Sequence, residues 1–372
     1  MNLIDLFAGC GGLSLGMELA GFNIPLAVEK DEWAAETYKF NHPTTKVVNK
    51  DITQILDLDS FFDRTIEIDG IVGGPPCQGF SLSGNRDKKD PRNSLFIEFV
   101  RFVEHFSPKF FVMENVQGIL SMKTQKGILV KDVILDEFSR LDYNVEIFKL
   151  NAAEFGVPQN RIRVFFIGMK NDIEYDKEKI EPKGFLFGKN QITIEQAIMD
   201  LPQIDSGEGE EFQKYPVEAT NDYQKWARNN SSGVYNHIAM KHTARLVERF
   251  SKIGYGQSVA DVAEEFQQRK RGDSSKISGK VYSQNNMRPY PNKPSPTIAA
   301  SFQSNFVHPF INRNFTAREG ARLQSFPDTY IFHGKRTTMS WEKNLSQYQQ
   351  IGNAVPPLLA KAIGKSIMDY LS

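Results

Sequence analysis

Residues 71–81, IVGGPPCQGFS, contain Cys77, one of only two cysteines in the chain. Two prolines precede the thiol and glycines stand close on both sides, a composition typical of a shaped loop rather than of a packed strand. A thiolate is a strong nucleophile once its pKa is lowered or a base assists it. We therefore expect Cys77 to be a catalytic nucleophile, while an inert packing residue is the alternative for any lone cysteine.

Two further segments place ionisable groups next to buried strands. Glu114 follows the apolar run FFVM, so burial is expected to raise its pKa and to let it hold a proton near neutrality. Arg161 and Arg163 alternate with apolar residues in NRIRVFF, and strand alternation would place both guanidinium groups on one face. The alternatives are a helix cap or salt bridge for Glu114 and a structural ion pair for each arginine.

The glycine-rich segment DLFAGCGG, residues 5–12, joins a predicted strand to a predicted helix. Glycines in such a turn let the backbone approach a ligand at the carboxyl end of the strand. Glu29 ends the next strand, where it could accept hydrogen bonds from ribose hydroxyls, and Asp51 could accept one from an adenine amino group. The third glycine of a dinucleotide motif is missing, so we prefer S-adenosylmethionine over a dinucleotide as the cofactor.

The elements that must position these groups are strands alternating with helices. Apolar strands are predicted at residues 2–7, 25–29, 69–73, 109–116 and 163–170, with helices at 13–22, 32–42 and 92–106. This alternation predicts an α/β fold with a mostly parallel, doubly wound sheet. Residues 171–235 are polar and irregular, 236–266 are predicted helical, 267–280 form a polar loop, and 355–371 form a helix that packs back onto the sheet.

The composition is that of a globular protein: 40% of the 372 residues are hydrophobic, 24% are charged and the net charge is zero. Residues 170–222 carry 6 basic and 13 acidic side chains, and residues 225–293 carry 13 basic and 5 acidic ones. The basic stretch could bind a polyanionic partner such as a nucleic acid, provided that other residues of the chain also point to one. The alternative is that both stretches are ordinary charged surfaces in contact with solvent. With no apolar run of membrane length and no leader-like N-terminus, we expect a cytoplasmic protein without metal or disulfides.

A thiol nucleophile, a carboxylic acid and an arginine beside an adenosine cofactor fit methyl transfer to carbon 5 of cytosine. Addition of the thiolate to carbon 6 makes carbon 5 nucleophilic, while an acid at N3 and a donor at the ring carbonyl assist the addition. The target base must be flipped out of the duplex to reach such a site.

In this order and spacing, the motifs resemble those of bacterial DNA (cytosine-5)-methyltransferases, most closely the modification enzymes of restriction systems. The resemblance covers nearly the whole chain. It rests on DLFAGCGGLSLGMELAGF, VEKD, KDIT, GGPPCQGFSLSGNRDKKDPRNSLF, ENV, QNRIRVFFIG, RPYPNKPSPTIAASF, REGARLQSFP and YQQIGNAVPPLLAKAIG. It implies a Rossmann-like S-adenosylmethionine-dependent methyltransferase sheet, with a smaller, irregular DNA-recognition domain inserted before the C-terminal helix.

The resemblance also implies roles for individual residues. Cys77 would be the nucleophile, Glu114 would bind the N3 edge, and Arg163 would contact the base with Arg161 as its neighbour. The cofactor pocket would comprise Phe7, Gly9, Gly11, Glu29, Asp51, Ile52, Pro76, Leu95, Asn353 and Val355. The expected DNA contacts are Ser81, Arg92, Arg269, Lys270, Arg271 and Arg288.

Three domains are expected: a catalytic and cofactor-binding domain (1–184), a target-recognition domain (185–295), and a hinge with the returning C-terminal segment (296–372). The family also implies a monomer, a duplex DNA partner, a separately acting endonuclease, and S-adenosyl-L-homocysteine as product. His237 and His242 are expected to pack or cap rather than bind metal. Two other functions stay open: a tRNA cytosine-5 methyltransferase, although the CFT signature of those enzymes is absent, and a catalytically silent DNA-binding regulator.

Overall fold

The computed structural model describes residues 1–60, 65–76, 94–124, 126–174, 176–188, 190–270, 273–277, 285–339 and 341–372. Contacts divide the chain into two compact units. The first unit comprises Met1–Phe155, Ile162–Phe185 and Ala354–Ser372, and the second comprises Gly156–Arg161 and Leu186–Asn353. Residues 296–353 therefore pack with the second unit, whereas the sequence grouped them with the returning C-terminal segment. A recognition role for residues 185–295 stays a prediction.

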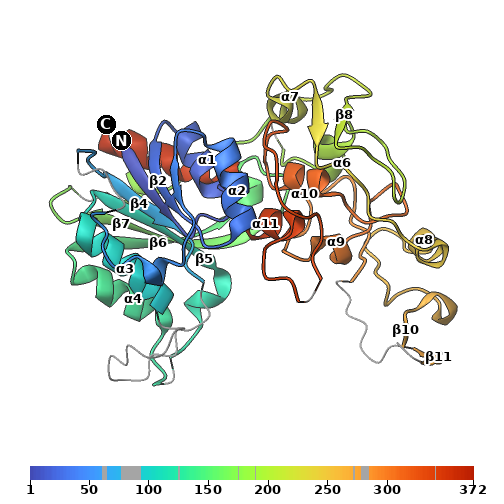
Figure 1. The fold of residues 1–372 in the computed structure, drawn as a ribbon, viewed down its shortest axis with the longest axis horizontal. Coiled ribbons are helices and arrows are strands. Elements are labelled where there is room, and N and C mark those ends of the chain that lie inside the picture. Colours follow the sequence, from blue (N-terminus) through green and yellow to red (C-terminus); the bar gives the residue numbers. More distant parts are fainter. Residues whose placement is uncertain are drawn as a thin grey trace. The chain divides into compact units, whose positions relative to one another are not determined.

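A seven-stranded sheet forms the centre of the first unit, in the order β3-β2-β1-β4-β5-β7-β6 (Figure 1). The first five strands in this order are parallel, and β7 is antiparallel to both β5 and β6. The bounds are β1 Asn2–Leu6, β2 Asn23–Val28, β3 Lys46–Val48, β4 Gly70–Gly73, β5 Phe110–Val116, β6 Tyr143–Asn151 and β7 Ile162–Lys170. The expected mostly parallel, doubly wound sheet is thus confirmed.

Helices cover both faces of this sheet, α1 and α2 on one side and α3 and α4 on the other (Figure 1). Their bounds are α1 Gly12–Leu19, α2 Glu32–Asn41, α3 Ser94–Phe106, α4 Val130–Ser139, α5 Lys177–Ile180 and α12 Pro357–Leu371, with short 3₁₀ turns at Ile52–Gln54, Gln117–Leu120 and Ala152–Phe155. Phe99 of α3 and Phe138 of α4 pack on Phe111 of β5: Phe111 and Phe138 are stacked, and Phe99 meets both edge-to-face. The C-terminal helix α12 packs on α1, as expected: a methyl group on Gly16 would lie 2.3 Å from the Cβ of Ala360.

The reversed strand β7 determines which residues meet at the carboxyl edge, the end of the sheet where β1, β2, β4 and β5 finish. Because β7 runs against β5, its first residues pair with the last residues of β5, and Arg163 is opposite Val116. The sequence predicted the strand at 163–170 but not its direction, and it missed β3 and β6. Edge strand β6 alternates only loosely between buried and exposed residues, so its periodicity was weak.

The second unit consists of short elements joined by long loops. Its elements are α6 Ile194–Ile198, β8 Phe212–Lys214, α7 Asp222–Arg228, β9 Gly233–Tyr235, α8 Ala244–Ser251, a 3₁₀ turn Glu264–Phe266, β10 Arg269–Lys270, β11 Asp273–Ile277, α9 Phe302–Asn305, α10 Ala317–Leu323 and α11 Gln347–Asn353. Two predictions were wrong here. Only α8 within 236–266 is α-helical, and β10 pairs antiparallel with β11 inside the segment that was predicted as a loop.

Buried arginines with carboxylate partners help to hold this irregular unit together. Arg322 is fully buried and bonds to both Asp200 and Asp328. Arg313 makes a bidentate pair with Glu319, which also closes a capping box at the start of α10. These pairs satisfy backbone and side-chain groups that loops would otherwise leave unbonded.

Candidate active site

The carboxyl edge brings together the two charged groups that the sequence singled out after buried strands. Glu114 near the end of β5 and Arg163 at the start of β7 form an ion pair, with Oε1 3.0 Å from Nε. Their side chains are 15% and 16% exposed, so the pair is largely shielded but open on one side. Arg163 also donates from Nη1 to the carbonyl oxygen of Ile162. A carboxylate and a planar donor are thus held side by side at the end of the sheet.

The same edge carries the segment that leads to the predicted nucleophile. Asn115, which is 4% exposed, donates from Nδ2 to the carbonyl oxygen of Pro75 at 3.0 Å. A methyl group on Gly74 would lie 3.2 Å from Glu114 Oε2, so the small residue leaves this carboxylate room. Cys77 itself lies outside the described residues, as do Ser81 and Arg92. Residues 74–76 nevertheless end beside Glu114.

Arg161 was expected to share a face with Arg163 by strand alternation, but β7 begins only at Ile162. It belongs to the second unit, is 1% exposed, and donates to the carbonyl oxygens of Ile298 and Gly352 at 2.8 and 3.0 Å. Its guanidinium group therefore holds the segment at Ile298 and the end of α11 rather than presenting these donors at a surface. Sequence alternation gave no signal of this break.

The glycine loop after β1 is held in a left-handed conformation. Phe7, Gly9 and Gly11 have φ values of 58°, 55° and 90°, which are unusual for Phe and ordinary for glycine. Glu29, at the end of β2, accepts from Gly9 N at 2.8 Å and from Asp31 N at 2.7 Å. Burial raises the pKa of Glu29, and these two backbone donors oppose the rise. A methyl group on Gly9 would meet nothing within 4 Å, so there is open space above the loop.

The remaining predicted cofactor residues lie on several different elements. Asp51 caps the 3₁₀ turn that follows β3, accepting from Thr53 N and Oγ1, and Ile52 beside it is buried. In the first unit Pro76 is exposed, Leu95 is half-buried in α3 and Val355 is buried. Asn353 is exposed at the end of α11 in the second unit. Cys10 is buried, burial raises the pKa of its thiol to about 12, and it packs as expected.

Sequence reasoning missed a buried polar cluster beneath the glycine loop. Ser14 of α1 donates to Asp5 Oδ2 at 2.6 Å, and Tyr38 of α2 donates to Ser14 Oγ at 2.6 Å. All three side chains are fully buried, and burial raises the pKa of Asp5 to about 7. The available signal in the sequence was the acidic residue Asp5 within the largely apolar strand NLIDLF. The cluster ties β1, α1 and α2 together around the loop.

The expected DNA contacts divide into two groups. Lys270 is exposed and Arg269 half-exposed on β10, whereas Arg271 lies outside the described residues. Arg288 is 6% exposed, and its five N–H donors bond to acceptors on Phe250, Ile253, His308, Pro309 and Asn312. No donor of Arg288 remains for DNA, so its geometry argues against the predicted contact. The side chain supports the surrounding loops instead.

The histidines pack within the second unit. His237 is buried between Thr316 Oγ1 and the carbonyl oxygen of Pro202 at 2.9 and 2.8 Å, which agrees with the expected packing role. Within the described part of the chain, no group of three or more His, Cys, Asp or Glu side chains could hold a metal ion. None of the described helices is long and apolar enough to cross a membrane.

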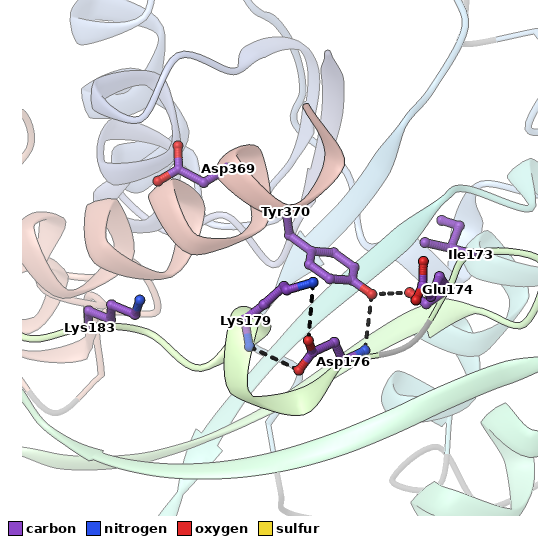
Figure 2. A pocket seen from close by; sticks show the side chains of 7 residues that line it. All are labelled: Ile173, Glu174, Asp176, Lys179, Lys183, Asp369 and Tyr370. Carbon is purple, nitrogen blue, oxygen red and sulfur yellow. Dashed lines mark hydrogen bonds and ion pairs between the residues drawn. The ribbon is translucent and has the colours of Figure 1, made fainter.

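A pocket of ≈ 430 Å³ lies at the opposite edge of the sheet, where residues after β7 meet the end of α12 (Figure 2). The Tyr370 hydroxyl donates to the carbonyl oxygen of Glu174 and accepts from Asp176 N, as the dashed lines in Figure 2 show. Lys179 pairs with Asp176 at 3.3 Å. These groups bond to one another and tie α12 to the turn after β7, remote from the Glu114–Arg163 pair.

Comparison with known sequences gives one consistent family. The family model for C-5 cytosine-specific DNA methylase matches residues 1–369. A curated protein of Desulfomicrobium norvegicum, type II methyltransferase M.DdeI, is 63% identical over 370 residues, covering 100% of this chain and 89% of that protein. Type II methyltransferase M1.HphI of Haemophilus parahaemolyticus is 37% identical, covering 99% and 87%.

Solved structures agree with the sequence relatives. A crystal structure of a putative DNA modification methyltransferase encoded within an Escherichia coli prophage superposes with a TM-score of 0.77 at 30% identity, covering 100% of this chain and 99% of that one. A Spodoptera frugiperda DNMT2 mutant has a TM-score of 0.61 at 18% identity and shares the fold. The Rossmann-like methyltransferase sheet is thereby confirmed.

Proposed function

Since this chain belongs to the C-5 cytosine-specific DNA methylase family, we propose that it methylates carbon 5 of cytosine within a specific sequence of duplex DNA. The observation that carries the proposal is the Glu114–Arg163 pair, open on one side at the carboxyl edge beside the segment leading to Cys77. Such a pair can bind a flipped cytosine by its N3 edge and its ring carbonyl.

The residues near the loop suit S-adenosylmethionine. Open space above Gly9 and the carboxylates of Glu29 and Asp51, each with lone pairs to spare, fit a nucleoside better than a pyrophosphate. Phe7, Gly11, Ile52, Pro76, Leu95 and Val355 would complete the pocket. When bound, the cofactor supplies an electrophilic methyl group and leaves as S-adenosyl-L-homocysteine.

The proposed chemistry uses the chain's own groups in sequence. The Cys77 thiolate would add to carbon 6, forming a C–S bond at the expense of the carbon 5–carbon 6 double bond, so that carbon 5 becomes nucleophilic toward the methyl group that the cofactor would supply. Glu114 hydrogen-bonds at N3, and Arg163 donates to the carbonyl oxygen, where negative charge develops. Loss of the carbon 5 proton to a base then expels the thiolate and restores the ring. No metal enters this scheme.

The named relatives support a biological role. Type II methyltransferases that resemble this chain over its whole length suggest that it modifies host DNA in a restriction-modification system, with the nuclease acting separately. We propose a bacterial cytoplasmic enzyme associated with nucleoid DNA that acts as a monomer. Residues 185–295 would read the target, and Ser81, Arg92, Arg269, Lys270 and Arg271 would contact the DNA backbone.

Incubation with duplex DNA and labelled S-adenosylmethionine, followed by bisulfite sequencing, tests this function. We expect protected cytosines in one short repeated context, and none with Cys77→Ser. Duplex DNA containing 5-fluorocytosine should also trap a covalent adduct, because fluorine cannot leave as the carbon 5 proton does. Label in tRNA but not in DNA would favour the RNA enzyme, and DNA binding without label in either would favour the silent regulator.

A further inference from the structure

An exposed aromatic pair stands out on the second unit. Tyr255 and Tyr290 are each 45% exposed, although they come from loops 35 residues apart. Their ring centroids lie 6.2 Å apart with an interplanar angle of 35°. Neither hydroxyl group bonds to another of the described residues. Large aromatic side chains left open to solvent in this way are typical of binding surfaces.

A cation completes the surface. Lys293 Nζ lies 4.7 Å from the centroid of the Tyr290 ring, and its ammonium group has no carboxylate partner within the described residues. The surrounding stretch 241–293 contains 11 basic and 5 acidic residues. The Lys293 ammonium group and the excess positive charge of this stretch favour a polyanion as the partner. The two tyrosine rings can contact bases and sugars, so a nucleic acid fits this surface better than an acidic or apolar protein face does.

The underlying backbone holds this surface rigid. Gly256 N donates to Arg288 O and Arg288 N donates to Gln257 O, at 2.7 and 2.9 Å. The buried Arg288 side chain then fixes both loops through its five hydrogen bonds. On the other side, Ile194 N donates to Lys293 O at 3.0 Å. A pre-organised surface loses less entropy on binding than a mobile one does.

Gly256 fits closely under the second tyrosine. It has a φ of +77°, and a methyl group there would lie 2.7 Å from the Tyr290 hydroxyl oxygen and 2.8 Å from its ring. The glycine therefore sets the position of Tyr290, and any side chain at 256 would move the ring. This contact offers a way to displace the aromatic surface without removing any of its functional groups.

We propose that Tyr255, Tyr290 and Lys293 form a contact surface for duplex DNA that contributes to target recognition. Lys293 contacts a backbone phosphate, and the two tyrosines contact the adjoining sugar or base edges. The proposal rests on the proposed DNA methyltransferase function and adds residues that the sequence did not assign. It also gives Arg288 a role, since the arginine predicted to touch DNA instead supports the residues that do.

The test compares DNA affinities of the full-length protein and its variants. Methylated sites are first mapped by bisulfite sequencing. Fluorescence anisotropy then measures the Kd for a short duplex containing the site and for one lacking it. Tyr290→Ala and Tyr255→Ala should each weaken binding to the site by roughly ten-fold. Lys293→Ala should weaken binding to both duplexes and reduce the salt dependence by about one phosphate contact.

Two further variants separate this role from loss of folding. Gly256→Ala should weaken DNA binding as Tyr290→Ala does, while S-adenosylmethionine affinity is retained. Tyr235→Ala is the matched control, because Tyr235 is a comparably exposed tyrosine that packs on Phe212 with ring centroids 5.0 Å apart. It should bind DNA like the wild type.

The outcomes distinguish the two proposals. If the wild type methylates DNA and the Tyr255, Tyr290 and Lys293 variants bind both duplexes as tightly as it does, the contact surface is refuted while the function stands. An equal loss in Tyr235→Ala would also refute it, because the effect would not be local. If the wild type methylates no duplex, the function itself fails.

Discussion

Glu114 and Arg163 face each other across two antiparallel strands, with Oε1 and Nε 3.0 Å apart. The two residues are 49 positions apart in the chain, and only the reversed direction of β7 brings them to the same edge. The bond occupies one carboxylate oxygen and one guanidinium nitrogen. A carboxylate beside a guanidinium group presents an acceptor next to donors, which matches the N3 edge and carbonyl of cytosine when N3 is protonated.

Glu114→Gln should slow methyl transfer strongly while the protein still folds. The amide preserves the shape of the side chain but loses the negative charge, and it cannot share a proton with N3 of the cytosine. We therefore expect kcat to fall by about 10²–10⁴-fold. S-adenosylmethionine affinity should change little. Single-turnover methylation and isothermal titration would measure the two quantities. Arg140→Ala, which removes an exposed arginine at the C-cap of α4, serves as a surface control, and an unchanged rate in Glu114→Gln would exclude this carboxylate from the chemistry.

Asn115→Ala should impair the reaction through the loop before Cys77. Loss of the Nδ2 donor leaves the Pro75 carbonyl without this bond, which costs about 1–3 kcal/mol for a buried acceptor. We expect less covalent adduct with 5-fluorocytosine DNA and a lower kcat, with Kd for the duplex unchanged. If adduct formation proceeds at the wild-type rate, Asn115 does not position the loop. Its effect would then be confined to stability.

The sequence predicted the first unit better than the second, for a physical reason. Buried parallel strands such as the one that contains FFVM, and the helix at 355–371, have strong local patterns of apolar residues. The same segments form a strand and a helix in the structure, so these patterns predicted them well. Arg288 shows the opposite case. An arginine in the loop-like segment NNMRPYPN is interpreted from sequence as a surface cation, and only the folded loops reveal five acceptors around it.

The same limit applies at the active site. The sequence placed Glu114 and Arg163 at strand ends, but the direction of β7 decides that they touch. Arg161 is two residues from Arg163 and was expected on the same face, yet the strand starts after it. The cluster around Asp5 was missed because its partners are brought together only by packing of α1 and α2 on the sheet.

Asp5 should make stability depend on pH in a direction opposite to that of a salt-bridged carboxylate. Burial raises its pKa from 3.8 to about 7, so the folded state binds the proton more tightly than the unfolded state does. Stability from this group is therefore full below about pH 4 and is lost as the pH rises toward 7, by up to about 4 kcal/mol. The nearby carboxylates of Glu29 and Glu18 act in the same direction.

Asp5→Asn should remove this slope. The variant should gain thermal stability relative to the wild type at pH 8 and show little or no gain at pH 4, measured by the melting temperature across that range. Ser14→Ala, which keeps the carboxyl group, provides the comparison. A constant difference between Asp5→Asn and the wild type at all pH values would show that Asp5 does not titrate in this window.

Gly16→Val should disrupt the packing of the C-terminal helix. Even one methyl group at position 16 would lie 2.3 Å from Ala360 Cβ and 2.4 Å from Pro357 O, and two of the three contacts are to backbone atoms that cannot rotate away. Overpacking of this kind costs about 1–3 kcal/mol or more. Melting temperature and hydrogen exchange in 357–371 would report the change. Gly118→Ala, where the added methyl group meets nothing within 4 Å, should be tolerated.

Arg322→Met should destabilise the second unit, because Arg322 is the shared partner of two buried carboxylates. Its Nε and Nη2 donate to Asp328 at 2.7 and 2.6 Å, and Nη1 donates to Asp200 at 3.0 Å. Methionine has a similar length but removes the cation that the two aspartates share, so that among the described basic residues Asp200 keeps only Arg228 and Asp328 keeps only the more distant Arg318; breaking a buried pair costs about 3–5 kcal/mol. Thermal unfolding would measure the loss. Lys225→Ala, which breaks an exposed pair with Asp222, should leave the melting temperature unchanged. If the two variants lower the melting temperature equally, the buried Arg322 network stabilises the protein no more than an exposed ion pair does.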